Sequence, residues 1–176
     1  SLPNYMPPEQ LETIQLQIYL DQQHFGPGVL DGKPGKYTLM AVEAYNLKNG
    51  IEGNDDAAAR AAAKEQVTHI FAIATIPSLA KDFVNPELPN DDNRELQALE
   101  KQLSYRSLAE FIAERYHTTE DILIAINGDT KIKNLKLRSP IRVPNVKPFL
   151  IENLSNGRGH KSDSDLSRRW VVVDTA

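Results

Sequence analysis

The stretch HFGPGVLDGKPGKYT, residues 24–38, separates two runs of helix-forming residues and prevents a helix from continuing through it. Between positions 26 and 35 it holds four glycines and two prolines, the residues that most often end helices. Asp31 lies at its centre, where an aspartate side chain can hydrogen-bond to its own backbone in an Asx turn. The stretch therefore predicts a tight, ordered turn between two helices.

Helical patterns flank this turn over residues 9–23 and 38–50. In the first run, Leu11, Ile14 and Ile18 recur at the spacing of one helix face. The second run closes with asparagine and glycine, because glycine readily adopts the left-handed conformation found at helix ends.

Five residues of this region are expected to hold the fold. Asp31 would close the Asx turn, and Gly32 and Gly35 would supply positive φ angles. Thr38 is placed to cap the second helix. Tyr45 lies on a face of that helix with apolar neighbours, which predicts a packing role.

Residues 54–102 are expected to form a connecting segment. It opens with an alanine-rich helix, and alanine favours helix while offering little surface to bury. The run VTHIFAIATIP, residues 67–77, is short and rich in β-branched side chains, which predicts a strand. A proline- and asparagine-rich loop at 84–93 and a further helix complete the segment.

Residues 103–148 read as a β-α-α-β unit. The run LSYRS, residues 103–107, is a candidate first strand, and Ser107 begins a helix in a capping-box pattern. Thr118 is the candidate cap of the second helix. The run SPIRVPNV, residues 139–146, predicts a closing strand bounded by prolines.

The last part of the chain is expected to lie outside this unit. Residues 149–169 are too polar to support a core, which predicts a linker. The run WVVVDTA, residues 170–176, reads as the first strand of a domain whose remainder is missing or truncated. The alternative is a final strand that pairs back onto this chain.

Composition limits the classes of function. The formal net charge of −4 gives no reason to expect nucleic acid as a partner, and no apolar run approaches the roughly 20 residues of a membrane span. The absence of cysteine excludes disulfides, thiolate metal sites and a cysteine nucleophile within this chain. The four histidines are widely spaced, so neither a metal nor a cofactor is expected.

The turn and its flanking helices resemble the peptidoglycan-binding-like domain, a small three-helix module. The shared pattern is F-x-P-G-x-x-D-G followed by G-x-x-T-x-x-A-V, and the module would occupy residues 1–53. This sequence has Pro34 where the family usually carries an aromatic side chain. The resemblance implies that nearby aromatic side chains such as Tyr37 contact peptidoglycan.

The runs SLAEFIAERYHTTEDILIAIN (107–127) and LRSPIRVPNV (137–146) are similar to a LysM module. In that family, N-acetylglucosamine chains lie against the loop after the first strand and the loop after the second helix. The resemblance therefore implies glycan binding by residues of both loops, namely Tyr105, Arg106, Ser107, Asn127, Gly128, Asp129 and Thr130.

The order of these parts resembles the N-terminal region of an L,D-transpeptidase of the YkuD type. In that family a cysteine thiolate performs catalysis, and this chain has no cysteine. The resemblance implies a non-catalytic region in the periplasm or the extracellular cell envelope of a bacterium. Its partners would be peptidoglycan or its glycan strands and a C-terminal transpeptidase domain.

Glu110 and Glu114 lie one helical turn apart beside Arg106 and Arg115, which predicts solvated ion pairs. A glycan-cleaving enzyme built on such a carboxylate pair would need one carboxyl with a pKa raised by an apolar pocket. That enzyme is the less favoured alternative.

We therefore expect an α+β protein, mainly α with short strands, in which a three-helix peptidoglycan-binding-like module precedes a β-α-α-β LysM-like module. The expected function is non-catalytic binding of the cell wall. The principal alternative is a structural or interaction module that packs on a catalytic domain without binding glycan.

Overall fold

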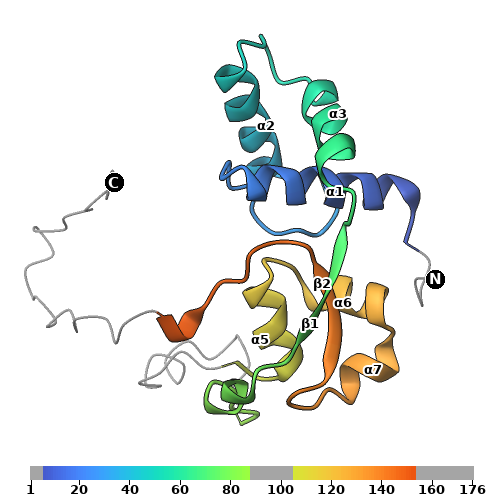
Figure 1. Cartoon of the computed structure of the whole chain (residues 1–176), viewed down its shortest axis with the longest axis vertical. Helices are drawn as coiled ribbons and strands as arrows, with labels where there is room; N and C mark the ends of the chain where they lie inside the picture. Colours follow the sequence, from blue (N-terminus) through green and yellow to red (C-terminus); the bar gives the residue numbers. More distant parts are fainter. Residues whose placement is uncertain (1–5, 88–104, 154–176) are drawn as a thin grey trace, which may run out of the picture.

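Residues 6–87 and 105–153 are described by a computed structural model, which shows an α+β fold (Figure 1). The fold class is confirmed at this level. The helices of these residues are α1 (Pro8–Gln22), α2 (Lys36–Lys48), α3 (Ala57–Gln66), α5 (Leu108–Arg115), α6 (Glu120–Asn127) and α7 (Asp129–Lys133). The strands are β1 (Phe71–Thr75) and β2 (Pro140–Pro144), and the short 3-10 helices are η1 (Ser78–Asp82) and η2 (Ile151–Asn153).

Several predicted elements lie outside the described residues. These are the helix expected before residue 103, most of the linker at 149–169 and the strand at 170–176.

The helices α1, α2 and α3 pack against one another at one end of the molecule (Figure 1). Their contact is filled by Leu16 and Leu20 of α1, Val42 of α2 and Ala59 of α3, all of which are buried. The alanines of α3 present a narrow face that lets this helix approach α1 closely. The helix expected to belong to a connecting segment therefore packs into the first helical group.

A buried glutamine on α1 holds the turn that follows it. The Gln17 side chain is fully buried, and its Nε2 donates to Lys33 O at 3.0 Å and to Thr38 Oγ1 at 3.1 Å. Its Oε1 accepts a hydrogen bond from the Gly32 backbone N–H at 2.9 Å. Asp31 Oδ1 accepts from Lys33 N at 2.9 Å, so the predicted Asx turn is confirmed.

The two glycines expected to need positive φ differ. Gly32 has φ +74°, and a Cβ there would collide with the Gln10 side chain and lie 2.9 Å from Gln10 O. Gly35 has φ −80° and open space around it, so the prediction of a positive φ at this position is wrong. Gly35 instead supplies the extended residue that precedes α2.

The prediction that Thr38 caps the second helix is also wrong. The helix begins at Lys36, and Thr38 lies inside its first turn with its side chain buried. Thr38 Oγ1 donates to Pro27 O at 3.2 Å, which ties the start of the turn to α2. Tyr45 is half-buried and packs edge-on against Tyr19 and Phe25, with both ring-centroid distances at 5.8 Å.

The sheet joins two segments that lie far apart in the sequence. Strand β1 pairs antiparallel with β2, with Phe71 opposite Pro144 and Thr75 opposite Pro140. The prediction that residues 103–107 supply this strand is wrong. Of those residues the structure describes Tyr105 to Ser107, and Tyr105 makes an isolated parallel bridge with Val84. Strand pairing follows matching faces and register, which chain order alone does not reveal.

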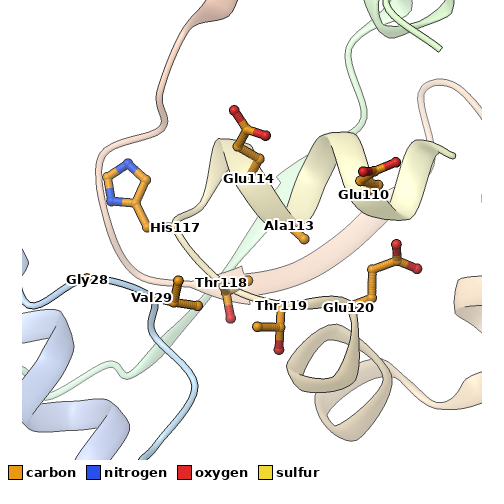
Figure 2. Close-up of a pocket in the computed structure, with 9 residues that line it drawn as sticks. All are labelled: Gly28, Val29, Glu110, Ala113, Glu114, His117, Thr118, Thr119 and Glu120. Atoms are coloured by element: carbon orange, nitrogen blue, oxygen red, sulfur yellow. The ribbon is translucent and has the colours of Figure 1, made fainter. Parts of the chain in front are cut away.

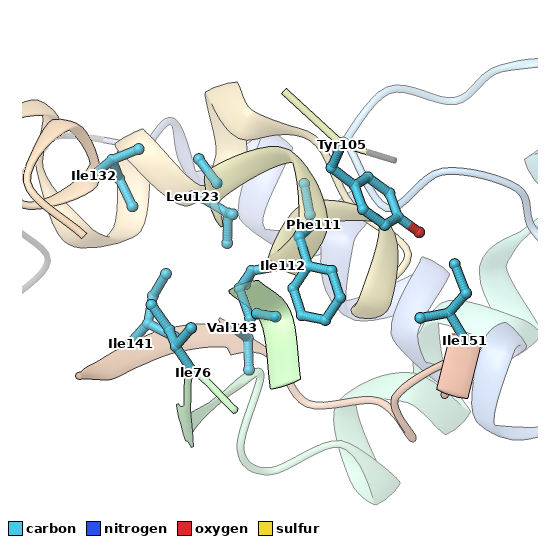
Figure 3. Close-up of a cluster of buried hydrophobic side chains, with 12 residues drawn as sticks. Ile76, Tyr105, Phe111, Ile112, Leu123, Ile132, Ile141, Val143 and Ile151 are labelled. Carbon is cyan, nitrogen blue, oxygen red and sulfur yellow. The ribbon is translucent and has the colours of Figure 1, made fainter. Parts of the chain in front are cut away.

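The helices α5 and α6 cover this sheet through a second buried cluster (Figure 3). Phe111 and Ile112 of α5, Leu123 of α6, and Ile141 and Val143 of β2 are buried in it. The predicted apolar faces of the two helices are therefore the faces that pack.

A third buried cluster joins the helical group to the group around the sheet. It contains Ile14 and Ile18 of α1, Ile122 and Ile126 of α6, and Leu30 from the turn. All five side chains are buried. The two groups consequently share one apolar core.

The different conformations of Gly32 and Gly35 predict different effects of alanine substitution on stability. Gly32→Ala should lower the free energy of unfolding by more than about 1 kcal/mol, because alanine is strained at positive φ and its Cβ would collide with Gln10. Gly35→Ala should change it by close to zero, because the lower entropy of the unfolded chain offsets the poorer N-cap. Urea unfolding of both variants checks this, and equal losses would contradict the described turn.

Candidate functional site

A cavity of about 450 Å³ lies where the turn after α1 meets α5 and the segment that joins α5 to α6 (Figure 2). One wall comes from the first helical group and the other from the group around the sheet. The lining residues are Gly28, Val29, Glu110, Ala113, Glu114, His117, Thr118, Thr119 and Glu120. We refer to this space as the junction cavity.

The turn side of the junction cavity is held by backbone contacts. Leu30 N donates to His117 O at 2.7 Å, and Thr118 Oγ1 donates to Leu30 O at 2.7 Å. The backbone bond belongs to an isolated parallel bridge between Leu30 and Thr118, and the Thr118 hydroxyl adds a side-chain bond to it. Both residues are buried. Val29, the residue before this bridge, is thereby placed at the mouth of the cavity, where it is 52% exposed.

The opposite wall is one face of α5. Glu110, Ala113 and Glu114 follow the i, i+3, i+4 spacing that places side chains on one side of a helix, and His117 follows just after the helix ends. Ser107 begins this helix, and its Oγ accepts a hydrogen bond from Glu110 N at 3.0 Å, so the predicted cap is confirmed.

The cap of α6 is one residue later than predicted. Thr119 Oγ1 accepts from Ile122 N at 3.3 Å, whereas Thr118 forms the bridge to the turn. Thr118 and Thr119 are equally suitable caps by residue type. Thr119 becomes the cap because Thr118 is engaged in the tertiary contact with Leu30.

Three carboxylates, those of Glu110, Glu114 and Glu120, contribute negative charge to the rim of the junction cavity. The pKa of Glu120 is raised by burial, and further by the charges of Glu110 and Asp121, while Arg106 opposes the shift. The pKa of Tyr105 is raised to about 12, first by burial and then by Glu114.

His117 forms a hydrogen bond that crosses between the two groups and becomes an ion pair when the imidazole is protonated. Its Nδ1 lies 2.9 Å from Asp21 Oδ1 at the end of α1. The hydrogen bond to Asp21 raises the pKa of His117, and partial burial opposes this. His117 also has φ +57°, an uncommon conformation for a residue with a side chain.

The first predicted set of glycan-binding residues supports the start of α5. Tyr105 is only 7% exposed, and its ring packs edge-on against Phe111 at 5.3 Å. Ser107 caps the helix, and Arg106 N donates to Glu110 Oε2 at 2.6 Å. The Tyr105 ring therefore belongs to the core and offers no exposed face for a sugar ring.

The second predicted set lies at the junction of α6 and α7. The Asn127 amide donates to Arg142 O and accepts from Arg142 N, both at 2.8 Å, which ties α6 to β2. Gly128 breaks the helix with φ +90°. Asp129 and Thr130 are exposed, and Asp129 pairs with a lysine of its own helix, Lys133.

Tyr37 is the most exposed aromatic side chain among the predicted binding residues, at 64%. It lies over Gly28 of the cavity wall, since a Cβ at Gly28 would come within 3.0 Å of Tyr37 Cβ. Tyr37 is thus close to the junction cavity, whereas Tyr105 and Asn127 contribute to the framework around it.

Sequence reasoning missed most of the junction cavity. The helical spacing of the lining residues on α5 is a usable signal, but the sequence indicates ion pairs of Glu110 and Glu114 with Arg106 and Arg115. Arg115 instead pairs with Glu152 through two bonds of 2.8 and 2.9 Å. Val29 and Glu120 carry no signal in the sequence, because only the folded chain brings them together.

No protein-family model matches the chain, and no curated protein sequence is significantly similar to it. The resemblances to peptidoglycan-binding-like, LysM and L,D-transpeptidase sequences therefore stay predictions. Over residues 6–87 and 105–153, no helix combines the length and the apolar character needed to cross a bilayer. The same residues contain no group of three or more His, Asp or Glu side chains that could hold a metal ion.

The ion pair between His117 and Asp21 predicts a pH-dependent stability. Because the pKa of His117 is raised in the folded state, its contribution is fully present below the unfolded pKa of about 6.5 and is lost as pH rises through the folded pKa. Asp21→Asn should therefore reduce the free energy of unfolding more at about pH 5.5 than at about pH 9, by on the order of 0.5 kcal/mol.

Urea unfolding at both pH values measures this difference. Asp82→Asn, an exposed aspartate on η1, is the matched control and should show no such pH dependence. Equal losses for Asp21→Asn at both pH values would show that the pair does not stabilise the junction.

Proposed function

We propose that this chain is a non-catalytic cell-wall-binding region whose ligand is peptidoglycan. The observation that best supports the proposal is the junction cavity, which has the size of a ligand site. One of its walls comes from the first helical group and the other from the group around the sheet. The sequence resemblances supply the class of ligand. Because the first helical group and the group around the sheet are fixed around one cavity, they would bind peptidoglycan with little reorganisation, which favours affinity.

We further propose that the two groups correspond to the two modules. Helices α1, α2 and α3 with the turn at 24–35 would be the peptidoglycan-binding-like module, and their mutual packing supports this. Strands β1 and β2 with α5 and α6 would be the LysM-like module. The order of elements supports this, because α5 and α6, together with the short α7, lie between the paired antiparallel strands in the sequence. Residues 67–77 would then supply the first strand of this module.

A sugar chain would need an apolar surface together with hydrogen-bonding groups. Tyr37 and Val29 supply exposed apolar surface beside the cavity, and the carboxylates on its rim can accept hydrogen bonds from hydroxyl and amide groups. Tyr105 and Asn127 would act indirectly, by holding the walls in place.

The proposal places the chain at the bacterial cell envelope, in the periplasm or outside the cell, as a targeting region for an L,D-transpeptidase domain. Since the chain has no cysteine, a reaction that needs a cysteine thiolate would have to occur on that separate domain.

One observation favours the alternative of an interaction module. Tyr37, Met40 and Leu47 lie on the exposed side of α2 and are 64%, 51% and 82% exposed. Apolar side chains gathered on one helix face are typical of surfaces that contact another protein.

Co-sedimentation with purified insoluble peptidoglycan across a salt series tests the proposal. Wild-type protein should be retained at high salt, and Tyr37→Ala should lower the retained fraction several-fold, because it removes apolar surface beside the cavity. Leu47→Ala is the matched control, since it also removes an exposed apolar side chain from α2. Its retention should equal that of the wild type.

Three outcomes would contradict wall binding at the junction cavity. Wild-type protein that stays in the supernatant would exclude targeting by this chain alone. Retention that disappears with salt would indicate non-specific charge attraction. Equal losses in the two variants would assign retention to the apolar face of α2.

A further inference from the structure

The middle of the junction cavity is apolar. Figure 2 shows Val29, Ala113 and Thr118 in the middle of the view, with Glu110 and Glu120 on one side and His117 on the other, and these three residues offer methyl groups to the space. Ala113 is buried on α5, and its small side chain leaves room that a longer side chain would occupy. An extended aliphatic chain is the kind of group that such a surface binds well.

The border of this apolar surface is negatively charged. Glu110 and Glu114 come from α5, and Glu120 comes from the first turn of α6. The nine lining residues include no lysine or arginine. The Arg115 guanidinium on α5 pairs with Glu152. The positive groups nearer the border are Arg106, which acts on Glu120, and the lining His117, whose ring bonds to Asp21.

The surroundings of Glu120 combine neighbouring carboxylates with only partial compensation by Arg106. Burial and the nearby carboxylates of Glu110 and Asp121 raise its pKa despite the opposing effect of Arg106. A bound cation would relieve this repulsion. A small metal ion is a poor candidate, since the described residues contain no carboxylate or imidazole group of three that could hold one.

We propose that the junction cavity binds an aliphatic chain that ends in an ammonium group. The methylene groups would lie on Val29 and Ala113, and the ammonium would sit at the charged border, beside Glu110 and Glu120. A long alkyl stem with a charged end suits an apolar surface with a polar rim. This inference rests on the proposed function in one respect, which is that peptidoglycan would be the polymer that carries the amine. The choice of an alkyl ammonium group follows from the charge and the shape of the junction cavity.

The test is an NMR titration of the ¹⁵N-labelled full chain with Nα-acetyl-lysine amide, whose only charge is its side-chain ammonium. Nα-acetyl-norleucine amide has the same alkyl stem without a strongly solvated cation and serves as the neutral probe. The lysine derivative should cause saturable shifts at the amides of Val29 and Thr118 to Glu120. The norleucine derivative should bind about threefold to fivefold more weakly.

Two variants connect this binding to the cavity. Glu120→Gln should weaken binding of the lysine derivative about threefold or more, because it removes one carboxylate of the rim. Glu43→Gln on α2 removes the same charge from a position outside the junction cavity and should have no effect. The spectra themselves show whether each variant remains folded.

The proposal is overturned if the lysine derivative causes no saturable shifts. It is also overturned if the neutral probe binds equally well, or if Glu43→Gln weakens binding as much as Glu120→Gln. Because the probes contain no wall polymer, these failures are independent of the co-sedimentation result. Peptidoglycan retention without binding of the lysine derivative would leave the proposed function standing and refute this inference.

Discussion

The rest of the structure depends on the hydrogen bonds of one buried amide, the Gln17 side chain. Its bonds to Gly32, Lys33 and Thr38 hold a turn whose backbone hydrogen-bonding groups have no partners in a helix or a sheet. Buried backbone groups left without partners would each cost about 1 to 3 kcal/mol, so this amide decides whether the turn is ordered. When the turn is ordered, Leu30 is placed against His117 and Thr118.

Leu30 joins the turn after α1 to the segment between α5 and α6, beside the His117–Asp21 bond and the shared apolar cluster. Its backbone bonds to His117 and Thr118 cross a sequence separation of up to 88 residues, and its side chain enters the apolar cluster shared by α1 and α6. The junction cavity is a consequence of this contact, since its turn wall is the residue pair just before Leu30. Any binding role for the cavity therefore depends on the same turn that ends α1.

Local features of the chain could be predicted from the sequence. Helical spacing located α1, α2, α5 and α6, Asp31 marked the Asx turn, and Ser107 marked the start of α5. Features that depend on distant contacts could not. The pairing of β1 with β2, the role of Thr38 and the junction cavity all require residues that approach only in the folded chain. Tyr105 shows the same limit, because its type fits sugar stacking while its burial assigns it to the core.

Hydrogen exchange at the Leu30 amide of the full chain tests most directly whether the turn joins the two halves. We predict that this amide exchanges as slowly as the most protected amides of both groups, for example those of Leu20 in α1 and Leu123 in α6, with one common free energy of opening. Fast exchange at Leu30, or different opening free energies for the two groups, would contradict it, because the groups would then open independently and the cavity would not be a fixed site.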